Sequence, residues 1–383
     1  MLPENNQKPL KVLHVVTVMD CGGVETRLME LMRHIDREKV RFDFCVHKNR
    51  KGYFDDEVKA LGGRIINCGP LKNLPMFCLR FYRMLKLSDY DVVHSHVPTF
   101  SAVCMTLAKW AGVKKRIAHF RNVTDPRDTS FVDYVIRKAI TRAILRNATD
   151  IIGITKAVLQ SWFGKNWNQN KKICPIYNGI NTKLYHCPPE PEQLKAEFNI
   201  PADHKIVVHV GRFHPQKNHV KLVSIAETFL AENDKVCFVL VGSGELKEQI
   251  EELVKTKGLD NNFRFAGVRD DVPRIMKASD VLLFPSAWEG LGGVIQEAIA
   301  AGLPMVASRL APIQEVLEIC GSAELIPVEA PDSQWAKALD RAVEKPRQLQ
   351  WLKELEASPF NIENAWQNLL AVYQIENLSP KFS

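Results

Sequence analysis

The feature that most constrains this 383-residue chain is its repeated alternation of strand-length apolar runs with segments of helical periodicity. The runs are rich in β-branched residues and nearly unbroken, which is typical of strands buried on both faces of a parallel sheet. The first half predicts strands at 11–18, 41–46, 64–68, 91–95, 115–119, 150–154 and 173–177. The second half predicts strands at 205–210, 236–241, 262–265, 281–285 and 304–307. Repeated βα units of this kind predict an α/β chain built from doubly wound sheets.

A proline-rich segment at 188–191 interrupts the alternation and predicts a linker between two domains. We therefore expect a first domain at 1–187, a linker at 188–204 and a second domain at 205–358. The last segment, 359–383, is expected to be a helix that crosses back to the first domain. Ligands of doubly wound sheets bind beyond the carboxyl ends of the strands, so the loops after the strands are where site residues are expected.

Composition excludes several classes of protein. Hydrophobic residues make up 46% and charged residues 25%, as in ordinary globular chains, which excludes a disordered or fibrous protein. The apolar runs are far shorter than the ~20 residues of a membrane span. The nine cysteines are scattered without a CxxC pair, and the first residues lack a signal-peptide pattern. These features predict a cytoplasmic protein.

Charge is distributed unequally along the chain. Residues 1–185 hold 31 Lys and Arg against 16 Asp and Glu, whereas residues 186–383 hold 20 against 28. Basic residues gather at 72–86 and at 109–146. Such a basic half favours a polyanionic partner, an anionic membrane surface ahead of nucleic acid. Two joined domains of different charge are the alternative interpretation.

Glycines and cations in the second half suit a nucleoside diphosphate. The loop 211–217 carries Arg212 and Lys217, whose charges can neutralise a diphosphate. Gly242 and Gly267 follow two further strands and allow the backbone to line a base pocket. A solvated loop with two cations and ordinary turns are the alternatives.

The glycine-rich stretch 289–297 is the most informative. Glu289 is predicted to lie in a loop, where it can reach a sugar hydroxyl, and Glu297 about two turns into the next helix. A carboxylate such as Glu297 can accept hydrogen bonds from both hydroxyls of a ribose. Helix N–H groups near Gly292 and Gly293 can hold a phosphate. In the alternative interpretation neither carboxylate binds a ligand: Glu297 is an exposed helix residue, and Glu289 is favoured by the helix dipole.

The first half offers glycines and histidines. Gly22 and Gly23 stand between the first strand and the first helix, where anions bind. His94, His96 and His119 lie at strand ends and can serve as acid, base or hydrogen-bond donor, although a structural role is the more common one. Asp270 and Asp271 are adjacent, so their side chains diverge, and Asp89 and Asp91 flank the start of a strand. No metal site is therefore predicted.

Six motifs occur in one order. They are Gly-Gly-x-Glu (22–25), Tyr-Asn-Gly (177–179), Gly-Arg-x4-Lys (211–217), Gly-Ser-Gly (242–244), Glu-Gly-x-Gly-x4-Glu (289–297) and Ala-Gly-Leu-Pro (301–304). Over roughly residues 11–330 this combination resembles the retaining GT-B glycosyltransferases of family 4, particularly those that build bacterial exopolysaccharide or lipopolysaccharide. The resemblance implies two Rossmann-like domains facing a cleft. It also implies a nucleotide sugar bound by the second domain and an acceptor bound mainly by the first.

The resemblance implies a role for each matched residue. The catalytic residues would be His119, Arg212, Lys217 and Glu289, and the acceptor-binding residues Gly22, His119 and Arg121. The donor would be bound by Gly23, Gly211, Arg212, Lys217, Gly242, Gly267, Glu289, Gly292, Gly293 and Glu297. Arg121 can meet an anionic acceptor such as a lipid diphosphate. The chain departs from the family at Asn181, where Asp is usual, and at Leu291, where an aromatic residue is frequent.

The resemblance further implies transfer with retained configuration and no bound metal or resident cofactor, because protein groups stabilise the leaving diphosphate. No residue is an obvious nucleophile, which favours attack on the same face as the departing phosphate. The expected partners are a nucleotide sugar, with a UDP-sugar favoured, a glycan or polyprenyl-linked acceptor, and the inner face of an anionic membrane. A UDP-sugar 2-epimerase of the same architecture is the alternative, and a nucleic-acid-binding protein a weaker one.

Overall fold

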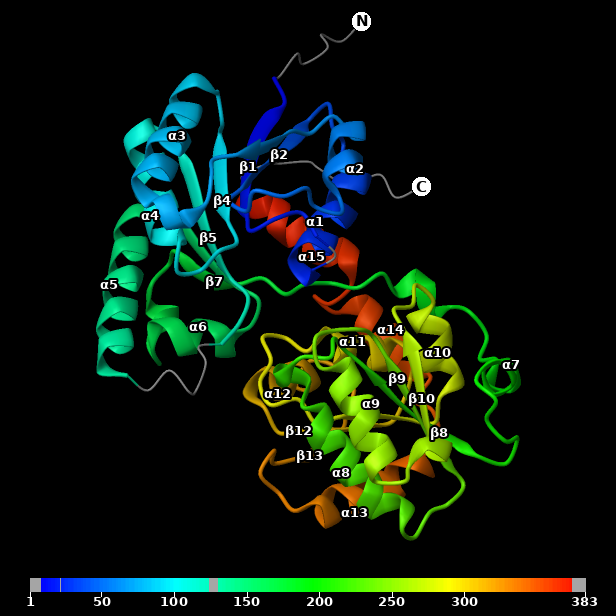
Figure 1. The fold of residues 1–383 in the computed structure, drawn as a ribbon. Coiled ribbons are helices and arrows are strands. Elements are labelled where there is room, and N and C mark those ends of the chain that lie inside the picture. Colours follow the sequence, from blue (N-terminus) through cyan, green and yellow to red (C-terminus); the bar gives the residue numbers. More distant parts are fainter. Residues whose placement is uncertain (1–7, 21, 124–129, 374–383) are drawn as a thin grey trace, which may run out of the picture. The chain divides into compact units, whose positions relative to one another are not determined.

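The computed structural model describes residues 8–20, 22–123 and 130–373, which fold into two compact units (Figure 1). The first, here called the N-unit, comprises Met1–Asn178 and Ala365–Ser383, and the second, the C-unit, is Gly179–Asn364. The division therefore falls after Asn178, before the linker that the sequence predicts.

The N-unit contains a seven-stranded parallel sheet. Its strands are β1 (Leu10–Val16), β2 (Val40–Val46), β3 (Ile65–Asn67), β4 (Val92–Ser95), β5 (Lys115–Phe120), β6 (Asp150–Gly153) and β7 (Ile173–Pro175). Their order in the sheet is β3-β2-β1-β4-β5-β6-β7. The chain moves outward from β1 in one direction and then returns to β4 on the other side. The carboxyl ends of β1 and β4 therefore mark the topological switch point, where doubly wound sheets bind ligands.

The C-unit repeats this plan with six parallel strands. They are β8 (Lys205–Val210), β9 (Val236–Val241), β10 (Phe263–Gly267), β11 (Val281–Phe284), β12 (Met305–Ser308) and β13 (Glu324–Ile326). Their order is β10-β9-β8-β11-β12-β13, which puts the switch point between β8 and β11. Every predicted strand of both sheets is present. The sequence did not predict β13, a three-residue edge strand whose first two residues are only partly buried.

Helices cover both sheets. In the N-unit they are α1 (Gly23–His34), α2 (Asp55–Ala60), α3 (Leu74–Leu87), α4 (Ser101–Ala111), α5 (Phe131–Asn147) and α6 (Lys156–Phe163). In the C-unit they are α7 (Pro191–Glu197), α8 (His219–Leu230), α9 (Lys247–Thr256), α10 (Val272–Ala278), α11 (Gly293–Ala300), α12 (Ala311–Leu317), α13 (Asp332–Val343) and α14 (Gln350–Ala357). Short 3-10 turns are η1 (Leu71–Asn73), η2 (Trp167–Gln169), η3 (Thr182–Tyr185), η4 (Pro215–Lys217) and η5 (Asp260–Asn262). Helices α3, α4 and α5 lie side by side (Figure 1).

The last helix, α15 (Ile362–Val372), carries the chain back to the N-unit. The ring of Trp366 lies 5.1 Å from that of His34, the last residue of α1. Within the segment 359–383, the residues from Ala365 onward belong to the N-unit.

The predicted linker at 188–204 is packed structure. It forms α7, whose Leu194 is fully buried, and Glu197 at the end of α7 pairs with Arg269 at 2.7 Å and with Arg274 at 2.5 Å. The last of the prolines that suggested a linker, Pro191, starts this helix, where proline is well tolerated because the first N–H groups have no helical partner. The segment therefore belongs to the C-unit.

Buried apolar residues explain why the strand signals are clear. All six residues of β9 are buried, so the run is continuous rather than alternating, as expected for a strand covered on both faces. Phe229 of α8 and Trp335 of α13 pack into the same core. Among the residues that the structure describes, no helix combines the length and apolarity needed to cross a membrane.

Candidate functional site

The switch point of the C-unit is closed by an ion pair. Lys217 ends the loop after β8, and Glu289 lies in the loop after β11. Lys217 Nζ lies 2.6 Å from Glu289 Oε1, and the two side chains are only 15% and 6% exposed. The Gln216 amide donates to the second carboxylate oxygen, Oε2, at 3.3 Å and to the Trp288 carbonyl at 3.0 Å. The structure therefore brings together two of the residues that the sequence assigned to donor binding.

This arrangement places two opposite charges at the carboxyl edge of the C-unit sheet. The Lys217 ammonium also lies 4.6 Å from the centre of the Phe284 ring, which orients it by a cation–π contact. Arg212, which was also predicted to bind the diphosphate, is exposed. Within the described part of the chain, its guanidinium makes no ion pair or hydrogen bond. The site can thus present two cations to an anionic ligand and one carboxylate to a hydroxyl.

The glycines beyond β8, β9 and β10 pack the site loops together. The Gly242 N–H donates to the Gly267 carbonyl at 2.7 Å, and a Cβ on Gly242 would lie 2.1 Å from the Gly211 carbonyl oxygen. Gly242 has φ +136° and Gly267 φ +68°, values that other residues rarely adopt. Their observed role is the close approach of neighbouring loops, and contact with a base stays a prediction.

The start of α11 lies beside the ion-paired loop. Gly292 caps the helix with φ +74°, and the helix begins at Gly293. The N–H groups of the first turn have no acceptor within a helix, so this end can hold an anion. Glu297 lies one turn into α11 rather than two, because the loop extends to Gly292.

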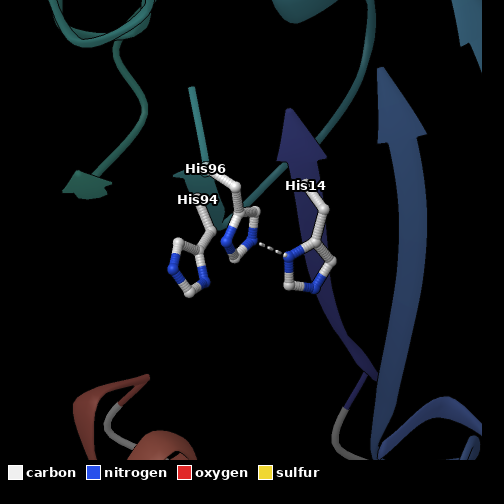
Figure 2. Close-up of side chains that lie close together, drawn as sticks. All are labelled: His14, His94 and His96. Atoms are coloured by element: carbon white, nitrogen blue, oxygen red, sulfur yellow. Dashed lines mark hydrogen bonds between the residues drawn. The ribbon is translucent and has the colours of Figure 1, made fainter. Parts of the chain in front are cut away.

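The switch point of the N-unit is lined with histidines. His14 of β1, His94 of β4, His96 just after β4 and His119 of β5 form what we call the histidine cluster, and their exposed fractions are 0%, 0%, 7% and 2%. His14 Nδ1 lies 3.0 Å from His96 Nε2 (Figure 2). His94 Nε2 lies 3.1 Å from His119 Nδ1. His14 and His94 are register partners on adjacent strands, which is why their rings meet.

Arg121 adds a buried charge to this cluster. The residue is 8% exposed, and its guanidinium lies 3.2 Å from His96 Nδ1, 3.4 Å from His119 Nδ1 and 3.3 Å from the Asn178 side-chain oxygen. Among the described residues no carboxylate comes within ion-pair distance of it. Burial lowers the pKa of Arg121 to about 10, which leaves it charged at neutral pH. A buried cation without a carboxylate is costly, and a bound anion would relieve that cost.

The histidines themselves are neutral. Burial, and next the charge of Arg121, lowers the pKa of His14 to about 3. Burial likewise puts the pKa values of His94, His96 and His119 well below the usual range. A neutral His119 can exchange hydrogen bonds with a ligand but is a poor acid at neutral pH.

Three histidines of this cluster lie close enough together to be considered as metal ligands. His14, His94 and His96 each have one ring nitrogen within 4.8 Å of the corresponding nitrogens of the other two (Figure 2). Imidazole nitrogens suit zinc, but the Arg121 guanidinium contacts the His96 ring at 3.2 Å and repels a divalent cation. The residues present therefore fit an anion better than a metal.

The Gly-Gly-x-Glu motif begins α1. Gly22 is the residue that caps the helix, and a Cβ on it would lie 2.4 Å from Glu25 Oε2, whereas Gly23 has open space around it. Burial raises the pKa of Glu25, and the charge of Arg121 partly opposes this effect. Glu25 is therefore a carboxylate near enough to Arg121 for the two charges to interact, which the sequence did not predict.

The Tyr-Asn-Gly motif has a structural explanation. Asn178 accepts from Arg121, and a Cβ on Gly179 would lie 2.5 Å from Ile362 Cα. Asn181, which replaces the usual Asp, caps η3 by accepting from the Lys183 N–H at 3.1 Å.

Two members of the N-unit site were missed from sequence. His14 is the one polar residue in the apolar run from Val12 to Val16, a signal that could have found it. Tyr373, whose hydroxyl lies 2.7 Å from His94 Nδ1, is 279 residues away in the chain and carries no such signal.

Comparison with known proteins fits this geometry. The family model described as Glycosyl transferases group 1 matches residues 190–356, and that described as Glycosyltransferase Family 4 matches residues 21–184. EpsF of Bacillus subtilis, named as a glycosyltransferase, is 30% identical over 98% of both chains. The capsular polysaccharide biosynthesis glycosyltransferase CapH of Staphylococcus aureus is 26% identical over 96% of this chain and all of CapH.

Two further similarities bear on ligands. An Escherichia coli UDP-Gal:alpha-D-GlcNAc-diphosphoundecaprenol alpha-1,3-galactosyltransferase is 26% identical over 80% of this chain and 81% of its own. The crystal structure of Anabaena HepE in complex with UDP and glucose superposes with a TM-score of 0.78 at 19% identity, covering 95% of this chain and 99% of HepE.

The two doubly wound units give the chain a GT-B fold. The chain belongs to the glycosyltransferase family of the group 1 and family 4 models, since it matches both in order and a full-length relative at 30% identity.

Proposed function

We propose that the protein transfers a sugar, with retained configuration, from a nucleotide-sugar donor to a glycan or lipid-linked acceptor in cell-surface polysaccharide synthesis. The observation that carries this proposal is the Lys217–Glu289 pair across the switch point of the C-unit. The names of CapH and the E. coli relative support the pathway and the acceptor class. A UDP-sugar is favoured because the HepE structure holds UDP and the E. coli relative is named for UDP-Gal.

Donor binding would redistribute the ion pair. A diphosphate competes with Glu289 for Lys217, and the exposed Arg212 supplies a second cation. Glu289 is then released from part of its contacts and can accept from a hydroxyl of the donor sugar. The first turn of α11 offers N–H groups to the phosphates, and Glu297 lies one turn further for the ribose.

The transfer step follows from these charges. Departure of the nucleoside diphosphate leaves negative charge on its oxygens, which Lys217 and Arg212 stabilise without reorganisation. No carboxylate is proposed as nucleophile. The acceptor hydroxyl attacks on the face that the diphosphate leaves, and the departing phosphate takes its proton. In this scheme the reaction requires no metal ion.

Arg121 and His119 would serve the acceptor side. A guanidinium that is 8% exposed and lacks a carboxylate partner among the described residues suits an acceptor that carries phosphate. A sugar linked to a polyprenyl diphosphate has this chemistry.

An anionic membrane surface is the proposed location of that acceptor. The first two turns of α5 expose Phe131 (77%), Val132 (61%), Val135 (48%) and Ile136 (52%). Four cations follow on the same helix at 137, 138, 142 and 146. Helix α5 begins after β5, so its apolar start lies at the sheet edge that carries the histidine cluster. Apolar side chains with flanking cations suit lipid, at about 1 kcal/mol for each cation near an anionic surface.

Vesicle binding tests the membrane proposal. We expect sedimentation with phosphatidylglycerol-containing vesicles to exceed that with neutral vesicles, and Val132→Ser with Val135→Ser to weaken it ~5-fold or more. Val220→Ser is the matched control, an equally exposed valine (52%) in the C-unit. Equal binding to both vesicles, or a double variant that behaves like Val220→Ser, would refute the proposal. A dimer by light scattering that dissociates in the double variant would assign the face to a second copy and also refute it.

Thermal stabilisation by UDP-, GDP- and ADP-sugars, with EDTA present, tests the transferase proposal. We expect one nucleotide to raise the melting temperature selectively and Arg212→Ala to abolish the shift. No shift with any sugar nucleotide at millimolar concentration would contradict donor binding, and a shift that EDTA removes would contradict metal independence.

A further inference from the structure

The histidine cluster forms a connected chain of hydrogen bonds in which each donor and each acceptor is defined by its neighbours. It has two branches, one from His96 to His14 at 3.0 Å and one from His94 to His119 at 3.1 Å. A neutral imidazole carries one N–H and one lone pair, so each contact requires a donor on one side and an acceptor on the other.

Arg121 sets the direction in both branches. A guanidinium donates and never accepts, so the nitrogens that it contacts, His96 Nδ1 at 3.2 Å and His119 Nδ1 at 3.4 Å, carry lone pairs. The proton of each ring is therefore on Nε2. His96 then donates from Nε2 to His14 Nδ1, which puts the proton of His14 on Nε2 as well.

Tyr373 completes the second branch. The lone pair on His119 Nδ1 is shared by two donors, the Arg121 guanidinium and His94 Nε2–H, so His94 keeps a lone pair on its own Nδ1. The Tyr373 hydroxyl, 2.7 Å away, donates to that lone pair. Burial raises the pKa of Tyr373, so its hydroxyl keeps the proton that it donates.

The outcome is that unused N–H groups remain at the ends of the chain. His14 Nε2 and His119 Nε2 are buried and have no hydrogen-bond partner among the described residues. A buried N–H without an acceptor costs about 1–3 kcal/mol, which a ligand oxygen would recover. His119 ends the branch that Tyr373 begins.

We propose that Arg121 and Tyr373 hold all four histidines as Nε2–H tautomers, so that His119 presents an N–H donor to the bound substrate. The substrate contact rests on the proposed function, whereas the tautomers do not. Arg121, Tyr373, His94 and His96 are positioning residues in this arrangement, because they act through the His119 ring.

Nitrogen NMR of the full chain with ¹⁵N-labelled histidine tests the tautomers directly. At neutral pH we expect His14, His94, His96 and His119 to show one protonated nitrogen each, Nε2. A Nδ1–H tautomer or a doubly protonated ring at any of the four positions would overturn the proposal, with or without a measured activity. Zinc should leave the spectrum unchanged, and a shift of the His14, His94 and His96 signals on adding zinc would favour a metal site instead.

Tyr373→Phe tests the positioning role. Loss of one hydrogen bond of ~1 kcal/mol should shift the His94 and His119 signals and lower kcat ~5-fold at unchanged donor affinity. Tyr90→Phe is the matched control, a buried tyrosine of the same unit that donates to Asp43 at 2.7 Å. If Tyr373→Phe leaves the histidine spectrum as Tyr90→Phe does, Tyr373 does not position His119. Altered signals with unaltered kcat would keep the tautomer lock and reject its link to catalysis.

Discussion

The two switch points of this molecule handle charge in opposite ways. In the C-unit, Lys217 and Glu289 neutralise each other at 2.6 Å, and Arg212 remains exposed. In the N-unit, Arg121 is buried among neutral histidines, and the described residues give it no carboxylate partner. The same sheet topology thus carries a self-compensated site and an uncompensated one.

This difference indicates which ligand chemistry each site can accept. A compensated pair can open for a ligand that brings both phosphate and hydroxyl groups, because each charge then finds a new partner. An uncompensated cation accepts an anion without losing an internal partner. The contrast fits a nucleotide sugar at the C-unit and a phosphate-bearing acceptor at the N-unit.

Acidification should produce the largest difference between the two units, because it destabilises the N-unit more than the C-unit. The buried histidines have folded pKa values below their unfolded ones, so the unfolded chain binds more protons and stability falls as the pH drops below about 6.5. The loss reaches up to about 1.4 kcal/mol per pH unit for each histidine that stays neutral, and it continues toward pH 3 for His14. Four such histidines lie in the N-unit. In the C-unit, burial lowers the pKa of His209 and lowers the pKa of His219 to about 4.

Hydrogen exchange between about pH 7 and pH 5.5, corrected for intrinsic rates, measures this for each unit. We expect β4 and β5 to lose more protection than β9 and β11. An equal or greater loss in the C-unit would show that the histidine cluster is not what limits stability.

Lys217→Ala should lower turnover ~10²-fold or more while the protein stays folded, because the leaving diphosphate loses a preorganised cation. Lys221→Ala is the matched control. Lys221 is 20% exposed against 15% for Lys217, and it pairs with Asp332 at 2.6 Å. Steady-state kinetics with the donor found by thermal stabilisation make the comparison. Turnover within a few-fold of wild type in Lys217→Ala would remove this residue from the mechanism.

Gly242→Ala should cost about 2 kcal/mol or more of stability, because its φ is +136° and a Cβ would lie 2.1 Å from the Gly211 carbonyl oxygen. Gly293→Ala, with no atom within 4 Å of the added Cβ, should change stability little. Thermal denaturation of the two variants measures this. Equal melting temperatures would mean that the loops relax, and the packing role of Gly242 would then be rejected.

Glu297→Ala should weaken the affinity for the nucleotide ~10-fold, from the loss of hydrogen bonds to the ribose. Calorimetric titration with the nucleoside diphosphate measures it, with the exposed Glu318→Ala as control. Unchanged affinity would exclude the ribose role.

Sequence reasoning predicted the fold well because unbroken β-branched runs leave few alternatives to a parallel sheet. It failed at β13 and α7, where three- and seven-residue elements carry too few residues for periodicity to show. Lys217 and Glu289 could each be named from sequence because they lie in loops that directly follow strands, but the sequence did not predict that they pair. The histidine network was only half predictable. Its members on strand ends could be seen, but Tyr373 joins them through tertiary packing that no local pattern encodes.

The return of α15 to the N-unit has a consequence for the synthesis of the chain. The ribosome must complete all of Gly179–Asn364 before Tyr373 and the part of α15 that belongs to the N-unit are made. At ~5–20 residues per second, the histidine cluster waits roughly ten to forty seconds for its last hydrogen-bond donor. The C-unit has a contiguous sequence and can fold within that interval. The N-unit is therefore the first to be translated and the last to be finished.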